Sequence, residues 1–287
     1  MASPVEPSPE ERATVAACHR NTIEGAWALI RLGPKARRRD WPGASAFSNA
    51  IPSSLTNSLF VTIPGTEVAP LLAIAAEFFG PGTPWKVVAI PETLGEVRTA
   101  AERGGLHPGE TDPGLLLDPI PPAPPVPSGL EVREVASEAD LRAFRYAAGA
   151  GFRIPRWILR VAMPRLRSDP EAGRSIPRFF VGYVGGRLVA SSLLYLSEGV
   201  AGISFVATVP EARRRGYGAA MTWAALEAGR RAGARVGYLQ ASAMGRPVYE
   251  AMGFREVSRY PIWMAQVPAL RLLRAAGRMV WLGLTVR

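Results

Sequence analysis

The chain has 287 residues, 48% of them hydrophobic, which is enough for two globular domains and too apolar for a disordered chain. Its formal charge of +10 favours an anionic ligand, although only Lys35 and Lys86 are lysines and a biased, arginine-rich composition explains the charge equally well. A single cysteine, Cys18, excludes an intramolecular disulfide. With only His19 and His107 beside it, no metal site is expected.

The start of the sequence, MASPVEPSPEER, lacks the basic and then apolar stretch of a secretory signal. No apolar run approaches the ~18 residues that a membrane-spanning helix needs. We therefore expect a cytoplasmic protein without stable membrane insertion.

The first part of the chain alternates helical and strand-like segments. They are a helix over 9–32, a strand over 57–63, a helix over 68–79, a strand over 86–90, a helix over 92–105 and an apolar end, GLLLD, at 114–118. The proline-rich stretch DPIPPAPPVPS (118–128) follows, where proline opposes both helix and sheet ladder. This composition predicts a domain over 1–117, a linker over 118–128, a second domain over 129–265 and a tail over 266–287.

The second part reads as a mixed α/β domain. Its segments are a strand over 131–135, a helix over 137–150 capped by Ser137, a helix over 156–166, strands over 178–184 and 187–196 around Gly185 and Gly186, a strand over 202–209, a helix over 218–234, a strand over 236–242, a helix over 246–252 and a strand over 254–265. The tail spaces Arg271, Arg274 and Arg278 along one helical face and Leu270, Leu273, Trp281 and Leu284 nearer another. Such a helix usually docks on its own protein, and an anionic membrane surface is the alternative.

A glycine-rich turn, PEARRRGYGAAM (210–221), connects the strand over 202–209 to the following helix. Unpaired backbone N–H groups at a helix N-terminus bind anions, and glycine lets the backbone approach a phosphate closely. Arginines at the rim add charge. The turn therefore predicts a phosphate site, with a solvated basic loop as the alternative.

The sequence around this turn resembles the GCN5-related N-acetyltransferase (GNAT) family. Arg213, Gly216 and Gly218 meet the family's pyrophosphate signature, which is Arg or Gln, two residues, Gly, one residue, and Gly or Ala. The segment SAMGRPVYEAMGF (242–254) is similar to the family's next motif, in which a tyrosine precedes a Gly-Phe pair. The resemblance covers about residues 129–265 and implies a mixed α/β GNAT fold with acetyl-CoA as cosubstrate.

The resemblance also implies roles for individual residues. Tyr249 would be the general acid that protonates the departing thiolate, and its alternative is an aromatic packed on the inner helix face. The residues expected to contact the cofactor are Val206, Ala207 and Thr208 along the strand, Arg213, Arg214, Arg215, Gly216, Tyr217, Gly218 and Ala219 in the loop, and Ser242 after the next strand.

No single general base stands out in the sequence. Glu198 and Glu131 are candidates, a chain of water molecules is the alternative, and each carboxylate is equally explained as a solvated surface group. Glu250 should point away from its neighbour Tyr249, because successive helical residues are about 100° apart.

The first half shows a faint repeat of the second. At a constant offset, Val88, Arg98, Glu102, Gly105 and Pro113 fall on Val236, Arg246, Glu250, Gly253 and Pro261, although chance identity is a serious alternative. If the repeat is real, the chain contains two GNAT-like domains in tandem. The first would be inactive, because VTIPGTEVAPLL lacks the spaced glycines and Ala101 stands where Tyr249 does. Its aromatics Trp41, Phe47 and Phe60 are expected in its core, with a wall of the acceptor pocket as the alternative.

Together with the phosphate loop, the resemblance implies an N-acetyltransferase that moves an acetyl group from acetyl-CoA to a small primary amine by direct attack. A homodimer is a further expectation. The alternatives are a non-catalytic acyl-CoA sensor of the same fold and a nucleic-acid binder, and the latter lacks the interleaved aromatics of a single-strand platform.

Overall fold

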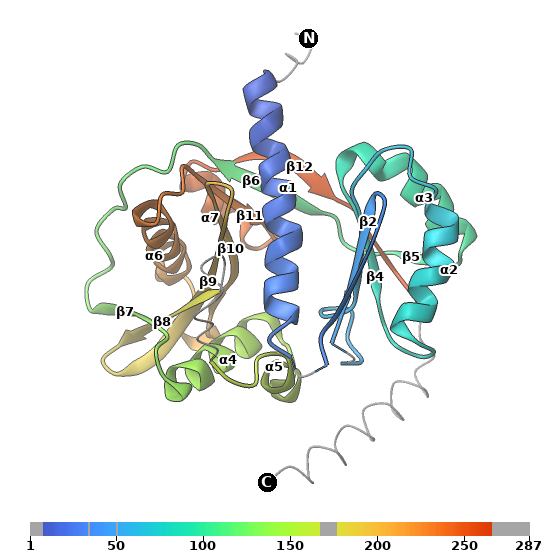
Figure 1. The fold of residues 1–287 in the computed structure, drawn as a ribbon. Coiled ribbons are helices and arrows are strands. Elements are labelled where there is room, and N and C mark those ends of the chain that lie inside the picture. Colours follow the sequence, from blue (N-terminus) through green and yellow to red (C-terminus); the bar gives the residue numbers. More distant parts are fainter. Residues whose placement is uncertain (1–7, 34, 50, 167–176, 266–287) are drawn as a thin grey trace. The chain divides into compact units, whose positions relative to one another are not determined.

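The structure of the chain is a computed structural model that describes residues 8–33, 35–49, 51–166 and 177–265. The helices are α1 (Pro9–Ile30), α2 (Val68–Phe79), α3 (Leu94–Arg103), α4 (Glu138–Phe152), α5 (Arg156–Ala162), α6 (Tyr217–Arg231) and α7 (Arg246–Ala251), with two short 3-10 helices, η1 (Pro91–Thr93) and η2 (Pro210–Ala212). The strands are β1 (Arg37–Trp41), β2 (Ala44–Ser48), β3 (Ser58–Val61), β4 (Lys86–Ala89), β5 (His107–Pro108), β6 (Asp112–Leu117), β7 (Leu130–Glu134), β8 (Arg178–Val184), β9 (Arg187–Ser197), β10 (Val200–Thr208), β11 (Val236–Gln240), β12 (Arg255–Tyr260) and β13 (Ile262–Met264). They form a six-stranded sheet, β1-β2-β3-β4-β13-β5, and a seven-stranded sheet, β12-β6-β11-β10-β9-β8-β7 (Figure 1).

The helices and strands follow the sequence pattern closely. The helix expected over 68–79 is α2 itself, and Ser137 caps α4 by accepting a hydrogen bond from the backbone N–H of Asp140. The arginine-rich segment at 37–41 is a strand that the sequence did not predict, and it pairs antiparallel with β2. The tail expected over 266–287 lies outside the described residues. Within the described part of the chain, no helix is both long and apolar enough to cross a membrane.

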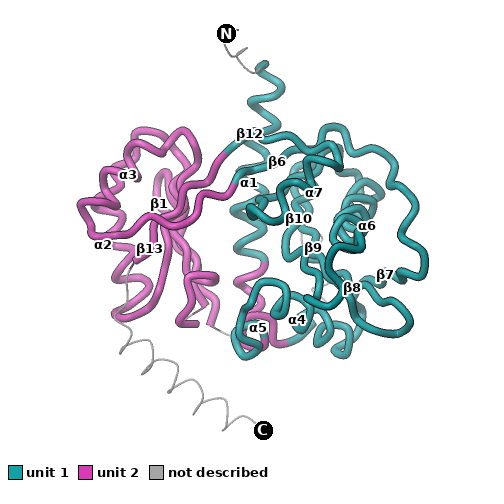
Figure 2. The backbone as a smooth tube through the Cα atoms, turned by 180° about the vertical axis from the view of Figure 1, so that it is seen from behind, with its two compact units in different colours: residues 1–28, 113–159, 165–258 teal, residues 29–112, 160–164, 259–287 magenta. Residues whose placement is uncertain are grey.

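The chain divides into two compact units (Figure 2). Unit 1 consists of Met1–Ala28, Pro113–Leu159 and Arg165–Ser258, and unit 2 consists of Leu29–Asp112, Arg160–Pro164 and Arg259–Arg287. This division differs from the linear one, 1–117 and 129–265 around a linker at 118–128, that the sequence predicts. Strand pairing and helix packing, rather than the proline-rich segment, decide where each segment belongs.

The last strand of each half pairs in the sheet of the other half. β6 lies between β12 and β11, and β13 lies between β4 and β5. Leu115 and Leu117 of β6 are buried in the core of unit 1, while Trp263 of β13 is buried in the core of unit 2. The single strand expected over 254–265 is therefore wrong as drawn: it breaks at Pro261, which has no backbone N–H to continue a ladder. The chain passes from one sheet to the other near Pro113 and near Pro261, and these two prolines also align with each other in the ungapped repeat of the two halves.

Helix α1 belongs to unit 1, although it precedes every other element in sequence. The buried amide of Asn21 donates to the carbonyl oxygen of Val200 at 3.2 Å and to the Ser197 hydroxyl at 2.9 Å. Gly202 makes room for this side chain, because a Cβ atom there would overlap the Asn21 Oδ1 atom. Polar contacts at the β9–β10 hairpin thus hold α1 in unit 1.

Unit 2 has its core on the face of the sheet that carries α2 and α3. Leu72 and Phe79 of α2 and Val97 of α3 are buried there against β3, β4 and β13. Phe47 and Phe60 are buried with their ring centroids 5.6 Å apart, and Trp41 packs edge-on against Phe78. Trp41 is partly buried against the core of unit 2, as expected. Phe47 and Phe60 are buried too, but they alternate with the core residues Ala46, Leu59 and Val61 along β2 and β3, so they face the opposite side of the sheet from that core.

Unit 1 has helices on both faces of its sheet. On one face α6 buries Met221, Ala225 and Leu226, and the Ser192 hydroxyl of β9 donates to the carbonyl oxygen of Met221. On the other face Phe144 of α4 packs edge-on against Phe179 of β8. The hairpin between β8 and β9 turns at Gly185 and Gly186, as the sequence predicted. The sheet is mixed, because β10 and β11 are parallel and most of the remaining pairs are antiparallel.

Candidate functional site

The parallel strands β10 and β11 separate halfway along β10. They pair only from Val200 and Val236 to Ile203 and Leu239, whereas β10 continues to Thr208. On its other side, the ladder with β9 shifts register between Ser204 and Ala207. An extra residue in one strand bends that strand and increases its twist, so β10 changes direction just after its pairing with β11 has ended, one residue before β11 itself ends at Gln240. The result is an opening in the sheet beside the predicted cofactor strand.

The loop after β10 presents unpaired amides at the start of α6. Arg214 and Gly216 have positive φ angles of 64° and 77°, and α6 begins at Tyr217. Among the described residues, no acceptor is bonded to the backbone N–H groups of 214–219, whereas the N–H of Ala220 already donates to the carbonyl of Gly216. Successive free amides at a helix N-terminus form an anion-binding concavity. The loop therefore has the geometry that the glycine pattern predicted.

The three loop arginines differ in direction. The Arg213 guanidinium lies inward, 3.5 Å from the carbonyl oxygens of Thr208 and Gly151, so it faces the C-terminal end of α4. Arg214 and Arg215 are exposed. The structure thus gives Arg213 a place between β10 and α4 and leaves Arg214 and Arg215 at the rim.

The two loop glycines serve different purposes. Gly216 needs its left-handed backbone, and a Cβ atom there would meet only Pro127, at 4.0 Å. Gly218 is helical, and its Cβ position lies 3.6 Å from the Thr208 hydroxyl, which is an ordinary contact. A Cβ atom alone would therefore meet no clash at Gly218, and the expectation that a side chain there would hold the backbone away from a phosphate stays a prediction. The Cβ would point at β10, while the backbone conformation at Gly216 shapes the loop.

Tyr249 of α7 lies against the first turns of α6. Its side chain is buried, packs edge-on against Phe254, and is hydrogen-bonded to Thr222. Thr222 in turn donates to the carbonyl oxygen of Gly218 at 3.0 Å. Burial raises the pKa of the Tyr249 phenol to about 12, against the smaller opposite effect of Thr222. The phenol is thus firmly protonated at neutral pH, as a proton donor must be.

Thr222 was not identified from the sequence. It stands one helical turn after Gly218 and 27 positions before Tyr249, so no local motif connects it to the phenol. Only the packing of α6 against α7 brings the two hydroxyls together.

Other predicted contacts lie in less distinctive surroundings. The Tyr217 side chain is buried in the core, so only its backbone can face a ligand. The Ser242 hydroxyl accepts from the backbone N–H of Gly245 at 3.2 Å, which closes the turn before α7. Val206 and Thr208 are half-buried and Ala207 is buried along the bulged part of β10, and Ala219 is half-buried in the first turn of α6. Their contacts with a cofactor stay predictions.

The candidate general bases are all engaged in ion pairs. Glu198 accepts three hydrogen bonds from Arg20, which lower the pKa of its carboxyl. Glu131 is held the same way by Arg133, and its pKa is also lowered. Glu250 pairs with Arg246 at 2.6 Å. A carboxylate with a lowered pKa is a weak base, so Glu198 and Glu131 do not favour a single carboxylate base.

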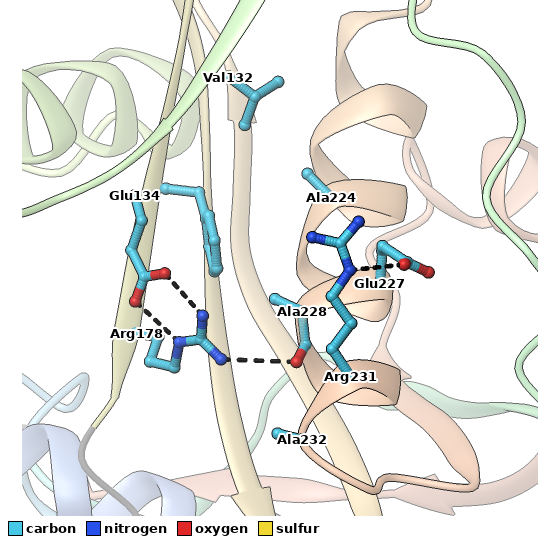
Figure 3. A pocket seen from close by; sticks show the side chains of 9 residues that line it. Val132, Glu134, Arg178, Ala224, Glu227, Ala228, Arg231 and Ala232 are labelled. Atoms are coloured by element: carbon cyan, nitrogen blue, oxygen red, sulfur yellow. Dashed lines mark hydrogen bonds and ion pairs between the residues drawn. The ribbon is translucent and has the colours of Figure 1, made fainter.

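A second hollow lies at the outer edge of the same sheet, between α6 and the strands β7 and β8 (Figure 3). Arg178 donates to both oxygens of Glu134 and to the carbonyl oxygen of Ala228 at 3.5 Å. Arg231 pairs with Glu227 at 2.8 Å. These charged groups already satisfy one another, and this hollow is far less suited to bind a charged ligand than the loop before α6.

Comparisons with known proteins agree with this geometry. Residues 152–254 match the model of the Acetyltransferase (GNAT) family. No curated protein matches the chain significantly.

Several solved structures are similar to the chain over most of its length. A GCN5-related N-acetyltransferase from Kribbella flavida has 18% identity and a TM-score of 0.63, covering 88% of this chain and 97% of its own. One from Sphaerobacter thermophilus has 20% identity and a TM-score of 0.57, with coverage of 91% and 94%. A tandem GNAT protein from the clavulanic acid biosynthesis pathway has 14% identity and a TM-score of 0.52, with coverage of 88% and 97%. At these identities the likeness establishes the fold, which is two GNAT-like sheets in tandem. Within the described residues, the glycine-rich loop before α6 and the shortened ladder between β10 and β11 belong to unit 1.

Proposed function

The second half of the chain belongs to the acetyltransferase (GNAT) family, and from this premise we propose that the protein is an N-acetyltransferase that uses acetyl-CoA to acetylate a small primary amine. The observation that carries the proposal is the coincidence of two features in unit 1. The sheet opens between β10 and β11 beyond Ile203, and the unpaired amides of residues 214–219 stand at the end of the same strand. An extended ligand with a phosphate at one end and a reactive group in the opening fits this arrangement.

The chain's residues would act as follows. The amides before α6, with Arg214 and Arg215 at the rim, hold the pyrophosphate. Acetyl-CoA, when bound, supplies the acetyl thioester. The amine nitrogen attacks the acetyl carbonyl carbon, the carbon–sulfur bond breaks, and Tyr249 gives its hydroxyl proton to the departing thiolate. The amine loses its proton to water, because the candidate bases Glu198 and Glu131 are held in ion pairs.

The proposal is tested by two measurements on the full chain. Isothermal titration calorimetry reports acetyl-CoA binding, and a thiol reagent reports the release of free CoA in the presence of a panel of primary amines. We expect binding together with amine-dependent CoA release. Salt-sensitive DNA binding of specific-site strength that acetyl-CoA leaves unchanged would contradict the assignment of the loop.

A non-catalytic acyl-CoA sensor is the second candidate, and the burial of Tyr249 favours it. The phenol packs in the core of unit 1 against Phe254 and is bonded to Thr222, which is also what a purely structural tyrosine does. Thermal stabilisation by acetyl-CoA without CoA release from any amine would identify the sensor.

The proposal also covers the location, partners and oligomeric state of the protein. It would act in the cytoplasm on a small-molecule amine, would have no specific nucleic-acid partner, and would form a homodimer. Size-exclusion chromatography with light scattering tests the homodimer.

A further inference from the structure

The C-terminal turn of α4 approaches the bulge of β10 very closely. A Cβ atom at Gly151 would lie 2.5 Å from the Cβ of Ala207, so only glycine allows this approach. The ring of the next residue, Phe152, meets the ring of Phe205 edge-on with centroids 5.7 Å apart. Phe152 is 46% exposed, so much of its ring faces solvent beside the opened strand. An aromatic surface thus borders the opening on the α4 face.

Phe205 is an unusual residue for its position. Its φ angle is +49°, a left-handed conformation that is costly for a bulky side chain and that glycine would adopt freely. Its ring is held by Phe152 and by Phe144, whose centroid lies 6.2 Å away. Strain of this kind persists where the surroundings enforce it, and it clusters at functional sites. We therefore expect the Phe205 side chain at the bulge to have a functional role in addition to the structural role of the bulge.

The two faces of the opening differ in character. The loop amides and Tyr249 belong to the α6 and α7 side, where the cofactor is expected. On the α4 side, the partly buried ring of Phe205 faces the helix layer that contains Phe152, and its neighbour Ser204 is exposed. A thioester in the opening is reached by an amine from this second side. That amine meets aromatic rings first, with the cationic Arg153 next to Phe152 in sequence and the loop arginines beyond.

We propose that the acceptor is a primary amine attached to an aromatic body, which packs against Phe152 and Phe205, and that polyamines are disfavoured. This inference rests on the proposed function. Aromatic rings prefer edge-to-face and offset contacts with one another, and a solvent-exposed ring at a reaction centre offers such a contact. A polyamine would gain little from these rings and would be repelled by the surrounding arginines, in a chain of formal charge +10.

The test compares 2-phenylethylamine with spermidine and ethylamine as acceptors of the full-length protein. We expect kcat/KM for 2-phenylethylamine to exceed that for either aliphatic amine by about tenfold or more. The Phe152→Ala variant should raise KM for 2-phenylethylamine about tenfold and leave KM for acetyl-CoA unchanged. Phe152→Tyr should restore the wild-type value.

Tyr146→Ala is the matched control. Tyr146 lies on the same helix and is 45% exposed, but six residues before Phe152 it points about 120° away, and Arg156 covers its ring at 4.6 Å. Its removal should leave all acceptors unaffected. Equal effects of Tyr146→Ala and Phe152→Ala, or a preference for spermidine, would overturn the proposal.

A binding measurement without turnover distinguishes a failure of the inference on the acceptor from a failure of the proposed function. Saturation-transfer NMR with 2-phenylethylamine and spermidine, in the presence of acetyl-CoA, reports contact with the amine directly. If acetyl-CoA binds and the aromatic amine does not, the inference on the acceptor fails while the proposed function stands. If acetyl-CoA does not bind at all, the proposed function fails and the inference that rests on it fails too.

Discussion

The parallel strand pairs β3–β4 and β10–β11 are each connected through a helix, but they differ in how far along the strands the pairing extends. In unit 2, β3 and β4 are joined through α2 and pair along their whole length, from Ser58 and Lys86 to Val61 and Ala89, and the N–H of Ile90 continues the ladder to Val61. In unit 1, β10 and β11 are joined through α6 and separate after Ile203. Strands that are hydrogen-bonded along their whole length leave no room for a thioester between them. The two halves therefore differ in the length of the parallel ladder and not in the order in which the strands are connected.

The loops before the two helices also differ. The loop before α6 has free amides, whereas before α2 the backbone N–H of Gly65 donates to the Glu96 carboxylate at 3.2 Å. Backbone hydrogen bonds, that of Gly65 among them, lower the pKa of Glu96. A carboxylate of the protein's own thus stands near the place where a phosphate would bind, and Ala101 replaces the tyrosine. The first half keeps the core of the fold but lacks the bulge and the phenol, and the Glu96 carboxylate takes the amide of Gly65 in its loop.

The largest effect is expected from removing the phenol. Tyr249→Phe should lower kcat about a hundredfold or more, because Tyr249 is the proton donor to the thiolate in the proposed step, and should leave the affinity for acetyl-CoA nearly intact. Steady-state kinetics and calorimetry measure the two quantities. Tyr183→Phe, at a half-buried site on β8, is the matched control. A parallel loss of binding and turnover would mean that Tyr249 only packs α7 against α6.

Alkaline unfolding should also depend on Tyr249. Its pKa is about 12 in the folded protein and close to 10 in the unfolded chain. The folded state therefore holds the proton through this window while the unfolded state loses it, so stability falls as pH rises from about 10 toward 12. The loss over the whole window is at most about 2.7 kcal/mol, at about 1.36 kcal/mol per pKa unit. Urea unfolding at pH 8 to 11.5 measures it, and the same pH slope in Tyr249→Phe would assign the loss to another group.

A smaller effect separates the two loops. Gly216 and Gly65 have nearly equal positive φ angles, 77° and 78°, and a Cβ meets no clash at either. Alanine should therefore cost about 1 kcal/mol of stability at both positions. Only Gly216→Ala should weaken acetyl-CoA binding, by about tenfold, because relief of the strain turns the free amides. Weaker binding in Gly65→Ala would show that the first half also takes part in cofactor binding.

The smallest effect is expected at Glu96. Glu96→Gln removes the charge near the Gly65 amide, yet it should confer no second acetyl-CoA site, since β3 and β4 stay closed. Calorimetry of the Tyr249→Phe, Glu96→Gln double variant should still give one site per chain. A stoichiometry of two would show that the carboxylate alone keeps the first half empty.

Sequence by itself determined the local features of this protein. The periodicity of apolar residues located α2, α4 and α6, because the residues on the buried face of a helix recur every three to four positions in the sequence. The spacing of Arg213, Gly216 and Gly218 located the loop, because the turn needs a left-handed residue just before the helix and Gly216 supplies it. The repeat at a constant offset predicted two similar halves, which the two sheets confirm.

Tertiary structure decided what depends on distant partners. The exchange of β6 and β13 between sheets follows from ladder hydrogen bonds that no local pattern encodes, and so does the membership of α1 in unit 1. The inward direction of Arg213, the pairing of Thr222 with Tyr249 and the contact of Phe152 with Phe205 each join residues far apart in the chain. Sequence specifies such contacts only through the whole fold, because a side chain's neighbours are set by how helices and strands pack and not by its position along the chain.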